Sequence, residues 1–150
     1  MAYRPPVYKV TLVRESGLNR ASSQRQVVSA PEDAANIFWG YLNGADREHF
    51  VMMGLTIKGR VIGIHTVSIG TLDSTLVHPR EVFKAAILMN AASIVVAHNH
   101  PSGDSEPSSA DIEITKVLHN AGRLLHVELL DHLVLGDKEF YSMKKRGHLE

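Results

Sequence analysis

The stretch SIVVAHNH, residues 93–100, decides the fold and points to the chemistry. Its first five residues form a short apolar run that is typical of a buried strand, and two histidines follow directly. His98 and His100 are two residues apart, so in an extended segment both side chains lie on one face and can reach one ion. Asn99 then points to the other face. We therefore expect a buried strand that delivers a histidine pair at its carboxyl end.

The segment after this strand leads to a third candidate ligand. Residues 101–107 are rich in Pro, Gly and Ser, which is typical of a loop. Ser108 and Asp111 have the spacing of a capping box, with the serine as N-cap and the acid at the third helical position. Two imidazoles and one carboxylate suit a catalytic zinc ion, because three protein ligands leave a fourth position for water. The predicted Zn²⁺ ligands are therefore His98, His100 and Asp111.

Helical patterns lie on both sides of this strand, which favours an α/β fold: a mixed sheet flanked by helices. Ser29 and Glu32 have the spacing of a capping box at the start of a first helix. Pro79 suits the first position of a second helix, and Gly122 suits the position just after a third. The predicted helices end near Asn43-Gly44, near Ala91 and near Asn120, and the third begins at Ser109.

The remaining apolar runs predict strands. Residues 7–13 alternate between apolar and polar side chains, and a polar loop over 15–26 follows them. Two further runs are joined by a tight turn at Lys58-Gly59. The predicted strands after the first are 49–57, 60–69, one long or two short strands over 124–135, and 139–142, with 70–77 as a loop or a short strand.

Composition limits the kind of protein. A chain of 150 residues without a long linker is most simply one domain, which we expect at 29–150 behind an extension over 1–28. The net charge of +0 does not support general nucleic-acid binding. The absence of cysteine excludes disulfides and thiolate zinc sites. No signal peptide or membrane-spanning run is recognised, so a cytoplasmic location is expected. Composition does not decide the oligomeric state.

The ligand pattern resembles that of the JAMM (MPN+/JAB) metalloprotease family, which has a distant upstream Glu, then H-x-H, seven residues, Ser, two residues and Asp. The chain matches this spacing from His98 to Asp111. It is more closely similar to the RadC-like JAB domain proteins, the UPF0758 group. The stretches that carry this resemblance are Ser68–Leu72, Val77–Phe83, His98–Asp104 and Asp131-His132.

This resemblance implies the JAB/MPN architecture, a three-layer arrangement like that of cytidine deaminases. It also implies a Zn²⁺-dependent hydrolase that cleaves peptide or isopeptide bonds in a peptide or protein-conjugate substrate. Ser108 would donate to the oxyanion. The family's upstream Glu would be the general base, and Glu48 holds the matching place before an early strand. Glu81 is the second candidate, although acids are favoured in the first turn of any helix.

Several other functions were weighed. An HNH nuclease is rejected because its three residues are not adjacent in sequence. An amidohydrolase barrel needs roughly 200 or more residues, and a zinc deaminase needs cysteine ligands. A metal-binding accessory or interaction module linked to DNA repair stays open as the alternative. Asp131-His132 also leaves two readings: a partner for a metal ligand, or a hydrogen bond of the core.

Overall fold

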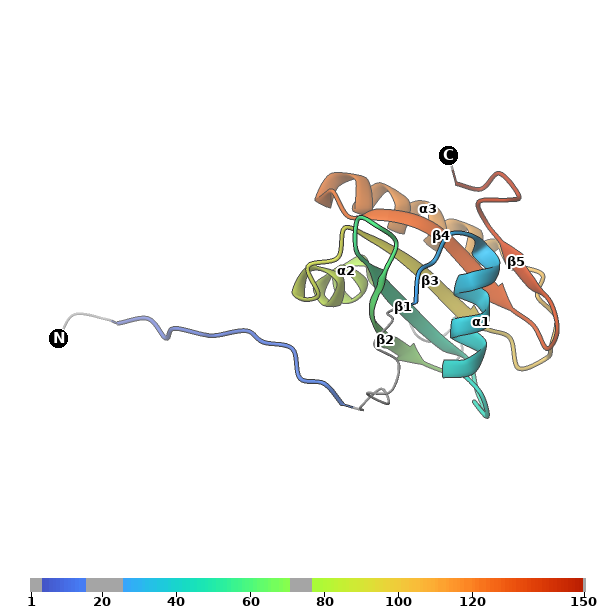
Figure 1. The fold of residues 1–150 in the computed structure, drawn as a ribbon, viewed down its shortest axis with the longest axis horizontal. Helices are drawn as coiled ribbons and strands as arrows, with labels where there is room; N and C mark the ends of the chain where they lie inside the picture. The colour runs from blue at the N-terminus through green and yellow to red at the C-terminus, as the bar shows by residue number, and fades with distance from the viewer. Residues whose placement is uncertain (1–3, 16–25, 71–76, 150) are drawn as a thin grey trace.

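A computed structural model of the chain describes residues 4–15, 26–70 and 77–149 (Figure 1). The helices are α1 (Pro31–Tyr41), α2 (Pro79–Leu88) and α3 (Ser109–Leu125), and the strands are β1 (His49–Leu55), β2 (Val61–Ile69), β3 (Ser93–Asn99), β4 (Glu128–Leu135) and β5 (Phe140–Ser142). The described elements follow the chain order α1, β1, β2, α2, β3, α3, β4, β5.

The strands form one mixed sheet in the order β2-β1-β3-β4-β5. β1 pairs antiparallel with both β2 and β3, β3 pairs parallel with β4, and β4 pairs antiparallel with β5. A parallel pair needs a long crossover connection, and α3 supplies it between β3 and β4. The predicted histidine-bearing strand is therefore the central one.

Helices cover both faces of the sheet, so the domain has three layers (Figure 1). On one face, Ile94 and Val96 pack in a cluster with residues of α2 and α3. On the other face, Val95 and Ala97 pack with residues of α1. We call these the α3 face and the α1 face. The alternation along β3 puts His98 on the α3 face, and the predicted α/β class is confirmed.

Two helix ends differ from the prediction. Ala30, not Ser29, is the N-cap of α1, because Asp33 accepts hydrogen bonds at 2.9 Å from the backbone N–H groups of residues 29 and 30. α3 runs past Gly122 and ends at His126, which has a left-handed φ of 56°. Gly122 is needed inside the helix, because a Cβ there would lie 2.5 Å from the Val127 carbonyl oxygen. β4 therefore begins later than predicted.

The predicted strand over 7–13 is wrong. Residues 4–15 form no strand, and their side chains are exposed. Alternating side chains can create an apolar face, but a strand also needs a hydrogen-bonded neighbour, which a local pattern does not supply. The predictions for 15–26 and 70–77 fall largely outside the described residues. Among the described residues, no helix combines the length and apolar character needed to cross a membrane.

Candidate metal centre

The three predicted ligands converge in space. His98 lies in β3 one residue before its end, His100 directly follows the strand, and Asp111 lies in the first turn of α3. One potential ligand atom from each lies within 4.8 Å of the others. His98 Nε2 is 3.1 Å from His100 Nε2 and 3.3 Å from Asp111 Oδ1, and His100 Nε2 is 3.7 Å from Asp111 Oδ2. His98 and Asp111 are fully buried. We call these three residues the ligand cluster.

The predicted capping box at Ser108 is present and holds Asp111. Ser108 Oγ accepts from the Asp111 N–H at 3.2 Å, and Asp111 Oδ2 accepts from the Ser108 N–H at 2.7 Å. One carboxylate oxygen is therefore engaged by the backbone, and the other faces His98. The cap fixes the orientation of the carboxylate as well as the start of the helix.

The loop after β3 orients His100. Its Nδ1 donates to the carbonyl oxygen of Asp104 at 2.8 Å, so the lone pair of the neutral ring is on Nε2, toward the ligand cluster. Gly103 shapes this loop with a φ of 84°, and a Cβ there would lie 2.5 Å from Asp137 Oδ2. This positive φ is a conformation that glycine adopts readily and other residues rarely adopt.

The electrostatics of the cluster suit a cation. Asp111 Oδ1 is buried and accepts no hydrogen bond, although buried polar atoms are normally paired. Burial by itself would raise the pKa of Asp111, but the nearby imidazoles of His100 and His98 outweigh burial and hold this pKa well below its usual range. The nearby carboxylate of Asp111 raises the pKa of His100. Two imidazole nitrogens and a carboxylate oxygen therefore form a set that fits a divalent metal such as zinc.

Glu48 lies beside the ligand cluster. Phe50 pairs with His98 in the antiparallel register of β1 and β3, and Glu48 directly precedes His49, the first residue of β1, at this end of the strand pair. The negative charge of Glu48 contributes to the raised pKa of His100, after the larger effect of Asp111. Glu81 has another environment: its carboxylate pairs with Lys84 at 2.8 Å in the first turn of α2.

Asn99 is a residue whose role the sequence did not reveal. Its Oδ1 accepts from the His49 N–H at 2.8 Å, and its Nδ2 donates to the Arg47 carbonyl at 3.0 Å. One side chain thus holds the backbone on both sides of Glu48. The Gly70 N–H also donates to the Glu48 carbonyl at 2.8 Å. No sequence pattern signals the Asn99 contacts, because their partners lie about 50 residues away.

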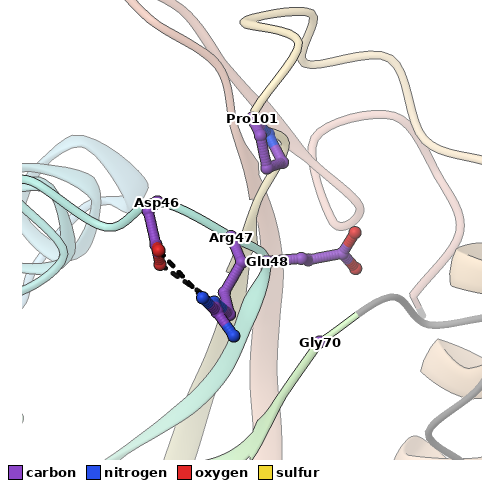
Figure 2. A pocket seen from close by; sticks show the side chains of 5 residues that line it. All are labelled: Asp46, Arg47, Glu48, Gly70 and Pro101. Atoms are coloured by element: carbon purple, nitrogen blue, oxygen red, sulfur yellow. Dashed lines mark hydrogen bonds and ion pairs between the residues drawn. The ribbon is translucent and has the colours of Figure 1, made fainter.

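A pocket of about 410 Å³ opens next to Glu48. Figure 2 shows the Glu48 side chain pointing away from Arg47, whose guanidinium pairs with Asp46 at 2.9 Å. Pro101, directly after the ligand His100, forms part of the same wall. A bound molecule in this pocket would therefore lie between the Glu48 segment and the loop that follows His100. The residues that line the pocket are Asp46, Arg47, Glu48, Gly70 and Pro101.

The two residues of Asp131-His132 have separate surroundings. His132 is fully buried, and its Nε2 lies 2.8 Å from Nδ1 of the ligand His98. Asp131 belongs to the scaffold: its carboxylate accepts from Ser142 Oγ at 2.5 Å and from the Lys144 N–H at 3.0 Å. Of these two residues, only His132 contacts a predicted metal ligand, and Asp131 forms hydrogen bonds of the core.

The fold and the ligand cluster define a class: a three-layer α/β domain with a buried His-His-Asp site that could hold a metal ion. Residues 28–148 match the RadC-like JAB domain family, and the chain belongs to this family.

The chain is also similar to curated UPF0758 proteins. It is 51% identical over 129 residues to one from Bacillus licheniformis and 50% identical over 129 residues to YsxA of Bacillus subtilis. One from Desulfitobacterium hafniense is 46% identical over 125 residues. These alignments cover 86%, 86% and 83% of this chain but 58%, 56% and 55% of the relatives. The chain thus spans a little over half the length of the curated relatives it matches.

Proposed function

We propose that this domain is a zinc-dependent hydrolase of the JAMM type that cleaves a peptide or isopeptide bond. The observation that carries the proposal is the position of Glu48: it directly precedes β1, its charge contributes to the raised pKa of the ligand His100, and it lines an open pocket. A metal site alone would also suit a structural or accessory role. A carboxylate beside the ligands adds the acid–base group that hydrolysis requires.

The ligands proposed for zinc are His98, His100 and Asp111. When bound there, zinc supplies Lewis-acid chemistry, which activates water and polarises a carbonyl. Glu48 takes a proton from the attacking water and passes it to the leaving nitrogen. The three ligands are held by His132, by the Asp104 carbonyl and by the Ser108 N–H, which favours a geometry that is set before substrate arrives.

Ser108 is proposed as the donor to the oxyanion. Its Oγ accepts from the Asp111 N–H, so the hydroxyl proton is not used in that bond and can be donated to another group. A donor aimed at the developing negative charge of the tetrahedral intermediate lowers the barrier for acyl transfer. The capping bond would keep the hydroxyl within one helical turn of the metal ligand Asp111.

The substrate is proposed to lie in the pocket between the Glu48 segment and Pro101. Its chemical class, a peptide or a protein conjugate, follows from the JAB family rather than from any contact of this chain. Cleavage profiling with peptide libraries and with ubiquitin-like conjugates would identify it.

Metal analysis tests the first half of the proposal. We expect about one zinc per chain after mild purification, and less than ~0.3 zinc per chain would contradict the metal site. Glu48→Gln tests the second half: it should retain zinc and reduce turnover by about 10²–10⁴-fold. Glu81→Gln is the matched control and should leave turnover unchanged. Zinc binding without hydrolysis of any library member would favour the accessory-module alternative.

A further inference from the structure

A chain of buried hydrogen bonds links two members of the ligand cluster, His98 and Asp111. His98 Nδ1 lies 2.8 Å from His132 Nε2, and His132 Nδ1 lies 2.6 Å from Thr115 Oγ1. Thr115 Oγ1 donates to the carbonyl oxygen of Asp111 at 2.6 Å. All of these residues are fully buried. The line thus joins β3, β4 and α3, and it begins and ends at metal ligands. We call it the His132 relay.

The direction of every bond in the relay follows from its last member. The carbonyl oxygen of Asp111 can only accept, so Thr115 must use its single hydroxyl proton there. Thr115 Oγ1 can then only accept from His132, which places the His132 proton on Nδ1. In a neutral imidazole the other nitrogen is an acceptor, so His132 Nε2 accepts from His98 Nδ1–H. His98 Nε2 is left with its lone pair directed at the cluster.

The surroundings keep His132 in this state. His132 is fully buried, and burial favours the neutral form of an imidazole. Phe50 packs on both rings: its centroid lies 6.1 Å from that of His98 in a stacked arrangement and 5.4 Å from that of His132 edge-on. The close packing leaves neither imidazole free to rotate.

We infer that Thr115 and His132 are positioning residues for the metal site: together they select the Nδ1–H tautomer of His98 and hold its Nε2 ready for a metal ion. The inference rests on the metal ligands of the proposed function, but not on hydrolysis. It assigns a role to two residues that never touch the metal. It also couples two ligands, because the relay connects the ring of His98 to the backbone of Asp111.

The relay explains how three ligand atoms stay close together. With His98 in this tautomer, its Nε2 and Asp111 Oδ1 face each other at 3.3 Å without a proton between them, and Asp111 Oδ1 accepts no hydrogen bond. Such an arrangement is repulsive unless a cation lies between the lone pairs. The folded core thus holds a site prepared for a metal, and loss of the relay should weaken metal binding.

Zinc affinity, measured by competition with a chromophoric chelator, tests this inference without any substrate. His132→Phe removes both ring nitrogens, and we expect about a 10–100-fold loss of affinity. His132→Gln offers an amide oxygen where Nε2 lies and should recover most of the loss. Thr115→Val removes the hydroxyl at nearly constant shape and should cost about 10-fold. Thr115→Ser, its matched control, should bind zinc like the wild type.

A second measurement separates positioning from general destabilisation. Ring ¹⁵N chemical shifts of His98 in the metal-free protein report its tautomer. The wild type and Thr115→Ser should show the proton on Nδ1, whereas Thr115→Val should move part of the population to Nε2. Ser142→Ala removes a buried hydroxyl that bonds Asp131, outside the relay. It should lower the thermal unfolding midpoint while leaving zinc affinity and the His98 tautomer unchanged.

The outcomes distinguish this inference from the proposed function. Wild-type affinity and tautomer in folded Thr115→Val would overturn the relay but leave the zinc site intact. Wild-type affinity in folded His132→Phe would do the same. A wild type that binds no zinc would overturn both. If the wild type binds zinc, the variants lose zinc affinity as expected and no conjugate is hydrolysed, only the proposed activity is contradicted.

Discussion

Two buried aspartates on opposite faces of the sheet have opposite surroundings. Asp111 lies on the α3 face and is fully buried, and Asp131 lies on the α1 face and is 4% exposed. Asp131 accepts from Ser142 Oγ, from the Lys144 N–H and from the His132 N–H, so both of its oxygens are paired. Asp111 Oδ1 accepts no hydrogen bond. The scaffold carboxylate of Asp131 thus has hydrogen bonds from the protein on both oxygens, whereas one oxygen of the Asp111 carboxylate has none.

The pKa values of the two buried carboxyl groups move in opposite directions because the partners around them differ. Burial raises the pKa of Asp131, and the neutral donors around it lower the value too little to compensate. Burial acts on Asp111 as well, but the imidazoles of His100 and His98 overcome it and lower the pKa. Basic partners, rather than depth in the core, therefore mark the residue that is prepared for a cation.

The largest expected effect comes from Asp111→Asn. Loss of an outer partner costs about 10–100-fold in metal affinity, so loss of a ligand should cost at least ~100-fold. The variant should stay folded, because the amide oxygen can still accept from the Ser108 N–H. Chelator competition measures the affinity, and circular dichroism checks the fold.

Asp131→Asn is the matched control for this comparison, because it makes the same substitution at the other buried aspartate. It should bind zinc with wild-type affinity. Equal loss of zinc in both variants would contradict the distinction between a metal-binding Asp111 and a scaffold Asp131.

Asp131→Ala should act on stability instead of on metal binding. It leaves the Ser142 hydroxyl and two backbone N–H groups buried without an acceptor, and we expect a loss of about 2 kcal/mol in the free energy of unfolding. Urea denaturation of the metal-free protein measures this loss. Unchanged stability, or a zinc content below that of the wild type, would argue that Asp131 is not a scaffold residue.

Asn99→Asp should have a smaller effect, directed at Glu48. The carboxylate still accepts from the His49 N–H, but it repels the Arg47 carbonyl and shifts the backbone beside Glu48. We expect turnover of the profiled conjugate to fall about 10-fold with zinc content unchanged. Asn43→Asp adds the same charge at an exposed position and should be neutral. A drop in zinc content would place Asn99 with the ligands instead.

The smallest expected effect is a change in the pH dependence of stability. Because its folded pKa is raised, Asp131 binds a proton more tightly in the folded state than in the unfolded chain. Its contribution to stability therefore falls as pH rises above the ordinary aspartate pKa of 3.8. Asp131→Asn has no such titrating group. Over this pH range its free energy of unfolding should therefore fall less than that of the wild type. Denaturation curves from pH 4 to 7 measure the difference, and parallel curves would contradict it.

Local patterns predicted much of the fold because short-range geometry sets them. The apolar run before His98 became the central strand, and the capping box at Ser108 and Asp111 formed as expected. Local patterns failed where the same short stretch of sequence suits two different local structures. Residues 7–13 alternate like a strand but have no strand partner. Gly122 suits a helix end, yet it lies inside α3, where a Cβ would collide with the Val127 carbonyl oxygen.

The sequence by itself determined the ligand cluster: strand alternation puts His98 and His100 on one face, and the helix cap turns Asp111 toward them. These are effects within about a dozen residues. Only the tertiary structure decided that His132 supports His98 and that Asn99 holds the Glu48 segment. These contacts join positions 34 and 50 residues apart. The physical reason is that sheet register and core packing choose such neighbours, and no local spacing encodes either.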